Sequence, residues 1–215
     1  MCSPYCTLLA ALQSAYSKIA GKQVARAPSY LNRAVIRHFN WLTDTIEASD
    51  GIHIIDAVEW GVRNADRVIH CDASLSGLGF VDLNTQIGFY ATIPPDALLN
   101  TIFFYEALCV ISAILWASEL LHVPRRLLVF TDSLNTVEMF NSLRSTDSYT
   151  ELLLFAMCIL LTLTLITLCV FHIPGTDNFI ADALSCQLLA TAASYLLGLQ
   201  VHLFQPPCSM LGLPL

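Results

Sequence analysis

The chain has 215 residues, and its 55% hydrophobic content supports a packed core and excludes a disordered protein. The formal net charge of -7 is unevenly placed: residues 1–43 carry five Lys or Arg and no acid, whereas the remainder carries five cations and seventeen acids. This asymmetry predicts a basic arm beside an acidic core, although a solvated helix face would give the same pattern.

The eight cysteines form no Cys-x-x-Cys pair, so neither a zinc site nor a disulfide framework is indicated. They are expected to be small buried side chains in a reducing compartment. Residues 1–15 lack the basic start and apolar core of a secretory signal. These features predict a cytoplasmic or nuclear protein.

The first predicted element is a helix within residues 30–51, where apolar side chains recur about once per turn. From Arg67 the pattern changes to short runs of alternating or β-branched residues separated by tight turns. The predicted strands are residues 68–72, 77–82 and 86–92. Three short strands joined in this way make an antiparallel meander.

A long helix is predicted over residues 102–121, between the Pro94-Pro95 pair and Pro124. A strand over residues 127–130 follows, and Asp132 and Ser133 are expected to cap a helix that ends near residue 143. Later patterns predict a helix over residues 148–163, a strand over residues 165–172 and a helix over residues 177–188.

A meander followed by crossover units predicts an α/β fold. The expected sheet is mixed and five-stranded, with three antiparallel strands, two crossover strands and helices on both faces. Three regions are expected: a basic helical lead-in over residues 1–60, the α/β domain over 61–190, and a C-terminal tail over 191–215.

Residues 152–171 contain no charge, and hydropathy alone would predict a membrane span there. Three threonines interrupt this run, which becomes β-branched and leads directly into a Pro-Gly turn. A buried helix followed by a buried strand explains these features better, so no membrane association is expected. A membrane-associated protein is the rejected alternative.

Four carboxylates stand in order along the chain, at Asp72, Glu106, Asp132 and Asp182. Asp72 and Asp132 end apolar runs, and the ends of strands are where open α/β sheets place their functional sites. Each acid taken singly could be a cap, a turn residue or a surface residue. The ordered set instead predicts a site for hard cations such as Mg²⁺, where two ions could assist hydrolysis of a phosphodiester.

The segments around these acids share a pattern with ribonuclease H domains. They are His70-Cys71-Asp72-Ala73-Ser74 with Gly77 and Gly79, Tyr105-Glu106-Ala107, Phe130-Thr131-Asp132-Ser133, and Pro174-Gly175-Thr176-Asp177-Asn178 through Ala181-Asp182-Ala183-Leu184-Ser185. They resemble the ribonuclease H domains of reverse transcriptases from long-terminal-repeat and related fungal-type retrotransposons, over residues 60–188. The last segment is the most specific. One departure is Cys186, where family members usually carry a basic residue.

The resemblance implies a ribonuclease H-like fold in which Asp72, Glu106, Asp132 and Asp182 bind two Mg²⁺ ions, with Mn²⁺ as an alternative. The implied activity is hydrolysis of the RNA strand of RNA-DNA hybrids. Ser74, Gly77 and Asn135 are candidate substrate contacts. A reverse transcriptase polymerase domain on another chain is a candidate partner.

A second hypothesis is that the chain is a catalytically inactive or domesticated relic. It would keep the ribonuclease H fold and bind nucleic acid or protein through its basic lead-in. The acidic core favours this alternative, as does the lack of a polymerase motif upstream.

Overall fold

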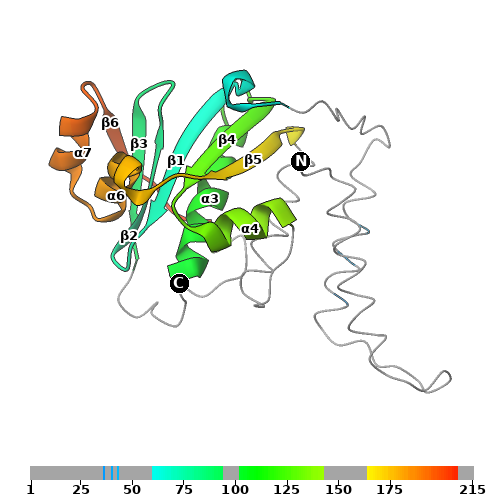
Figure 1. Ribbon diagram of the computed structural model, residues 1–215, viewed down its shortest axis with the longest axis horizontal. Coiled ribbons are helices and arrows are strands. Elements are labelled where there is room, and N and C mark those ends of the chain that lie inside the picture. The colour runs from blue at the N-terminus through cyan, green and yellow to red at the C-terminus, as the bar shows by residue number, and fades with distance from the viewer. Residues whose placement is uncertain are drawn as a thin grey trace, which may run out of the picture.

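The computed structural model describes residues 60–93, 102–142 and 164–207, together with Ile36, Asn40 and Thr43. Within these residues a mixed sheet has the strand order β5-β4-β1-β2-β3-β6 (Figure 1). The strands are β1 (Arg67–Ala73), β2 (Gly77–Asp82), β3 (Ile87–Thr92), β4 (Arg126–Thr131), β5 (Thr167–His172) and β6 (Gln200–Leu203).

The first three strands form the predicted antiparallel meander, in which β1 pairs with β2 and β2 pairs with β3. The strand β4 runs parallel to β1, and β5 runs parallel to β4, as expected for crossover strands. Since β1 and β4 are parallel neighbours, their carboxyl ends lie side by side. This adjacency places Asp72 near Asp132.

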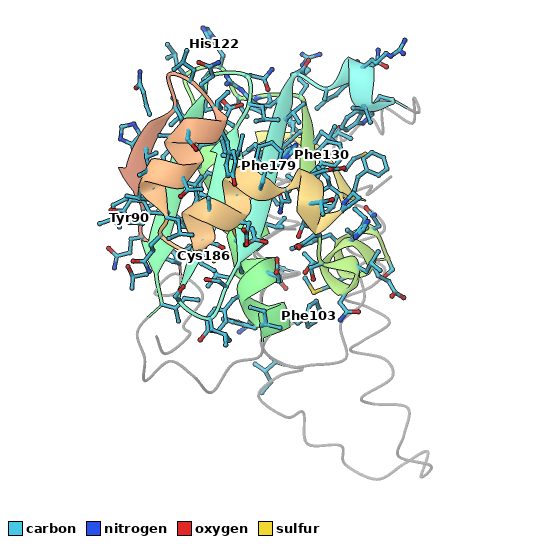
Figure 2. All side chains as sticks on the ribbon, turned by 60° about the vertical axis from the view of Figure 1, so that its left-hand side comes forward. Tyr90, Phe103, His122, Phe130, Phe179 and Cys186 are labelled. Carbon is cyan, nitrogen blue, oxygen red and sulfur yellow. The ribbon has the colours of Figure 1, made fainter. Side chains whose placement is uncertain are left out.

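The helices are α3 (Ile102–Ser118), α4 (Leu134–Ser142), α6 (Phe179–Ser185) and α7 (Leu189–Tyr195), with 3-10 turns at Val62–Asn64 and Gly175–Asp177. In Figure 1, α3 and α4 lie on one face of the sheet, and α6 with its neighbour α7 lies on the other. Phe103, in the first turn of α3, and His122, just beyond its end, lie at opposite ends of the sheet (Figure 2).

Two hydrophobic clusters explain why helices cover both faces. Side chains alternate between faces along a strand, so Leu78 and Phe80 of β2 join the cluster around α3. Val81 instead packs with Leu184 of α6 and Ala192 of α7. The predicted α/β class is therefore confirmed, because the described residues form a mixed sheet with helices on both faces.

The sheet has six strands rather than the five expected. The additional strand β6 pairs in parallel with β3, so residues 200–203 of the predicted tail are part of the sheet. The segment does alternate polar and apolar residues, but it is only four residues long and its side chains are mostly exposed, so it gives a weak strand signal. The predicted helix over residues 177–188 is also shorter, because Gln187 has a left-handed backbone conformation (φ 60°) that ends α6.

Some expected elements cannot be compared with the structure. The helix over residues 148–163 lies outside the described residues, as does the helical lead-in over 30–51 except for Ile36, Asn40 and Thr43, which are helical. In the described part of the uncharged run, Leu168 and Val170 are buried in β5. None of the helices formed by the described residues has the length and apolar character needed to cross a membrane.

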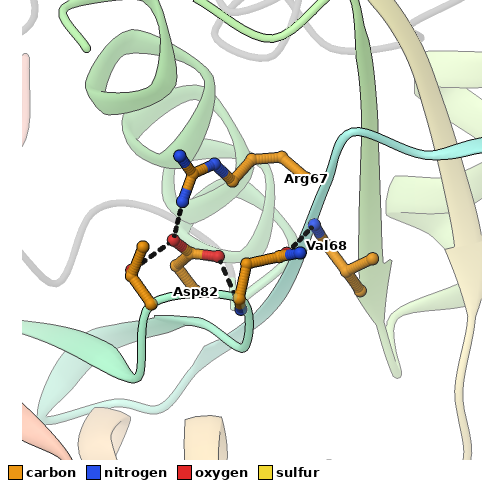
Figure 3. Close-up of polar contacts among 5 residues, drawn as sticks. Arg67, Val68 and Asp82 are labelled. Carbon is orange, nitrogen blue, oxygen red and sulfur yellow. Dashed lines mark hydrogen bonds and ion pairs between the residues drawn. The ribbon is translucent and has the colours of Figure 1, made fainter. Parts of the chain in front are cut away.

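Asp82 fixes the end of the meander that is remote from Asp72 (Figure 3). Its fully buried carboxylate accepts hydrogen bonds from Arg67 at 2.6 Å, from the Asn84 backbone N–H at 3.0 Å and from the Thr85 hydroxyl. The side chain of Asn84 in turn accepts the Val68 N–H at 2.8 Å. These bonds hold β1 and β2 in register.

Candidate metal and catalytic site

Three of the four predicted carboxylates converge at one end of the sheet. Asp72 is the sixth residue of β1, Glu106 is the fifth residue of α3, and Asp132 directly follows β4. Each offers one carboxylate oxygen, and these oxygens lie within 4.8 Å of one another. We call these three residues the carboxylate triad.

The apolar surroundings of the triad come from the elements that carry it. Helix α3 is buried on most of its surface, so Glu106 stands among apolar neighbours and is only 7% exposed. Asp72 follows the buried Cys71 and is only 5% exposed. Asp132 is half-buried at the start of the loop that leads into α4.

Burial raises the pKa of both buried triad members. The pKa of Asp72 rises to about 7 because of burial and the nearby charges of Asp132 and Asp182, although a hydrogen bond from Ser185 opposes the rise. The pKa of Glu106 rises to about 8 because of burial and the charges of Asp72 and Asp132, opposed by a hydrogen bond from Thr131. Ionising the triad is therefore unfavourable unless positive charge is supplied.

This donor set fits a hard divalent cation. Mg²⁺ prefers oxygen ligands and is usually held by one or two carboxylates together with water and substrate phosphates. Three carboxylate oxygens within 4.8 Å offer such ligands, and the mutual repulsion of their charges would be relieved by a cation. Asp72, Glu106 and Asp132 are therefore the residues that could hold it.

Thr131 supports the triad, a role that its place in the sequence motif does not reveal. Its completely buried hydroxyl donates a hydrogen bond to Glu106 Oε2 at 3.4 Å and accepts the Ser133 backbone N–H at 3.3 Å. As the last residue of β4, it links α3 to the loop that carries Asp132. The sequence feature that could have indicated this role is a polar residue that ends an apolar strand and directly precedes an acid.

Asp182 lies close to the triad but outside it. The residue is exposed on α6, and its charge contributes to raising the pKa of Asp72. The Sγ of Cys186 lies 3.9 Å from Asp182 Oδ1. The structure thus brings three of the predicted ligands together and places the fourth at their margin.

The segment between β5 and α6 closes on the triad from the side. A Cβ at Gly175 would lie 3.1 Å from Asp132 Oδ2, so a larger residue there would crowd that carboxylate. Asn178 is completely buried and donates from Nδ2 to the Cys71 carbonyl at 2.9 Å. This bond ties the start of α6 to β1, one residue before Asp72.

The predicted substrate contacts have different surroundings. The Ser74 hydroxyl donates to the Ser185 carbonyl at 2.9 Å and accepts the Gly77 N–H at 3.1 Å. Gly77 is buried, and a Cβ there would lie 2.7 Å from the Ser185 carbonyl oxygen. Asn135 is exposed in α4, three residues after Asp132. Ser74 and Gly77 therefore have structural roles, and all three substrate contacts stay predictions.

Comparison with known proteins gives structural neighbours of low identity. No family model matches the chain, and no curated protein matches it. Ribonuclease H1 from the halophilic archaeon Halobacterium salinarum NRC-1 aligns with 58% of this chain and 97% of its own, at 18% identity and a TM-score of 0.45. LC11 ribonuclease H1, solved in complex with an RNA/DNA hybrid, aligns over 55% and 92%, at 20% identity and a TM-score of 0.43.

A foamy viral protease-reverse transcriptase, also solved with an RNA/DNA hybrid, aligns with 82% of this chain at 14% identity and a TM-score of 0.43. The matched region spans 28% of that viral protein. Likeness at this level does not establish function, which has to be inferred from the carboxylates themselves.

Proposed function

We propose that the chain is a ribonuclease H-like nuclease that hydrolyses the RNA strand of RNA-DNA hybrids with the help of two divalent cations. The observation that carries the proposal is the carboxylate triad, whose oxygens lie within 4.8 Å of one another at the carboxyl ends of two parallel strands. Its members are three of the four acids that the sequence motifs single out.

The chemistry assigns separate tasks to the ions and to the protein. Bound divalent cations would lower the pKa of water and neutralise charge on the departing oxygen of a phosphodiester. Asp72, Glu106 and Asp132 would hold and orient these ions, and Asp182 would complete the site from α6. Thr131 keeps Glu106 in place, and burial keeps the triad from being fully solvated.

The proposal also specifies the substrate as an RNA-DNA hybrid. Selectivity for RNA requires contacts with the 2′-hydroxyl, which DNA lacks. The sequence resemblance to reverse transcriptases supports an RNA-DNA hybrid, a retroelement origin and a polymerase domain on another chain as partner.

The test is cleavage of hybrids that carry the label on either the RNA or the DNA strand. With Mg²⁺ the full chain should shorten only the RNA strand, and Asp72→Asn should reduce the rate by at least about 100-fold because one triad ligand loses its charge. Glu138→Gln is the matched control, since Glu138 is an exposed acid of α4 outside the triad. Equal cleavage by the Asp72→Asn variant would refute the proposed site.

A non-catalytic nucleic-acid-binding or protein-binding relic is the second candidate. Asp182 stands outside the triad, which favours this alternative. A folded chain that binds hybrid but cuts neither strand with Mg²⁺ or Mn²⁺ would establish it.

A further inference from the structure

Ser185, the last residue of α6, connects that helix directly to the triad. Its side chain is completely buried, and its hydroxyl donates a hydrogen bond to Asp72 Oδ2. The Ser185 carbonyl accepts the Ser74 hydroxyl at 2.9 Å, and Gln187 Nε2 donates to the Ser76 carbonyl at 3.0 Å. The end of α6 is thus fastened both to β1 and to the turn between β1 and β2.

Two glycines allow this close approach. A Cβ at Gly77 would lie 2.7 Å from the Ser185 carbonyl oxygen, and a Cβ at Gly79 would clash with the Ser185 backbone nitrogen. Real Cβ atoms do not approach other atoms so closely, so α6 can lie against β2 only because both positions lack a side chain. The position of the Ser185 hydroxyl is therefore set by backbone packing.

The hydroxyl has two oxygen acceptors within reach, Asp72 Oδ2 and the Asp182 carbonyl at 2.9 Å, and the weaker acceptor Cys186 Sγ lies at 3.9 Å. A hydroxyl has one proton to donate, and an ionised carboxylate is the stronger acceptor. With Asp72 ionised, the hydroxyl therefore holds one carboxylate oxygen and fixes the rotation of the carboxylate group. Asp182 precedes Ser185 by three residues, so one turn of α6 carries both.

We infer that Ser185 is a positioning residue that orients the Asp72 carboxylate for cation binding and couples the placement of α6 to the triad. This inference rests on the proposed function, because it assumes that the triad binds divalent cations. Ser185 does not itself contact the reacting atoms.

The test is calorimetric titration of the full chain with Mg²⁺. Hydrogen-bond partners of metal ligands typically change metal affinity by about 10-fold to 100-fold when they are lost, so Ser185→Ala should weaken Mg²⁺ binding by about 10-fold. Ser112→Ala is the matched control: it also removes a buried helical hydroxyl, but that hydroxyl donates to the Leu108 carbonyl within α3. Its Mg²⁺ affinity should equal that of the unaltered chain.

A second readout separates orientation of the ligand from damage to the fold. If Ser185 orients Asp72, the Ser185→Ala variant should need more Mg²⁺ for half-maximal cleavage but approach the unaltered rate at saturating Mg²⁺. Should Ser185→Ala fail to fold, Ser185→Cys decides the question: its thiol is a weaker donor, so this variant should bind Mg²⁺ more weakly than the unaltered chain, and equal affinity would overturn the inference.

Unchanged Mg²⁺ affinity in folded Ser185→Ala, with Mg²⁺ binding intact in the unaltered chain, would overturn the inference and leave the proposed function standing. Failure of the unaltered chain to bind Mg²⁺ would instead overturn the proposed function, and the inference with it.

Discussion

Asp72 shows how a single side chain combines a structural cost with a functional use. It is almost fully buried, lies beside two other acids and has a pKa raised to about 7 from an ordinary value of 3.8. A residue selected only for stability would not be an acid at this position. The cost is consistent with a site that is complete only when a cation is bound.

The pKa shifts predict how stability depends on pH. Asp72 and Glu106 have folded-state pKa values of about 7 and about 8, above their ordinary values, so the folded chain binds more protons than the unfolded chain. Their contribution to the free energy of unfolding is fully present below about pH 4 and is lost as pH rises through 7 to 8.

Mg²⁺ should reverse this loss, so the rise in melting temperature caused by Mg²⁺ should be small at pH 5 and several degrees at pH 8.5. Thermal melts in Mg²⁺ and in EDTA across this pH range measure the change in melting temperature that Mg²⁺ causes. Other titrating groups affect both series equally, so their contribution cancels in this comparison. An equal effect of Mg²⁺ at both pH values would count against a cation in the triad.

The residues of the site differ in how well they can be predicted from the sequence. Asp72, Glu106 and Asp132 could be predicted because each follows or opens a recognisable apolar element within a distinctive motif. The contributions of Thr131 and Ser185 could not, because Thr and Ser are common and only the fold shows which carboxylate each hydroxyl reaches.

Among the elements, the strands of the meander were predicted to within one residue at each end because their turns and apolar runs are local features. The break between α6 and α7 was not predicted, because a non-glycine residue, Gln187, adopts the left-handed conformation there. The strand β6 was also missed, since its polar-apolar alternation covers only four residues and its place in the sheet depends on pairing with β3.

The packing of α6 against β2 predicts the effect of a single added methyl group. In Gly79→Ala, the new Cβ would clash with Ser185 N and lie 2.7 Å from the Ala181 carbonyl oxygen. Overpacking of this kind destabilises proteins by about 1–3 kcal/mol, so the melting temperature should fall by several degrees.

Gly61→Ala is the matched control for this variant, because a Cβ there meets nothing within 4 Å. Its melting temperature should stay within about one degree of the unaltered chain, since exposed substitutions usually change stability by less than about 0.5 kcal/mol. Equal melting temperatures for the two variants would contradict the described contact between α6 and β2.

Across the described part of the chain, the positively charged side chains lie away from the carboxylate triad. The Lys and Arg residues among those the structure describes are Arg63, Arg67, Arg125 and Arg126. Arg67 and Arg126 begin β1 and β4, whereas the triad lies at the far ends of these strands. Among the residues that the structure describes, a nucleic-acid backbone at the triad would therefore meet acids rather than Lys or Arg, so cations that contact its phosphates would have to come from the rest of the chain.

The basic segment over residues 1–43 is the candidate source of these cations. Replacing its five basic residues by Gln should weaken hybrid binding by at least about 10-fold at low salt and make binding less sensitive to salt, because fewer counterions are released. The replaced residues are Lys18, Lys22, Arg26, Arg33 and Arg37. Filter binding across a salt series measures both effects, and an unchanged salt slope would exclude the segment from substrate binding.

Anomalous diffraction from crystals of the full chain grown with Mn²⁺ would show directly whether the triad binds metal ions. Two anomalous peaks roughly 3.5–4 Å apart are expected in contact with Asp72, Glu106 and Asp132. A single peak would restrict the site to one ion. No peak at the triad, in crystals where Mn²⁺ occupies other sites, would contradict the claim that these carboxylates form the metal centre of a nuclease.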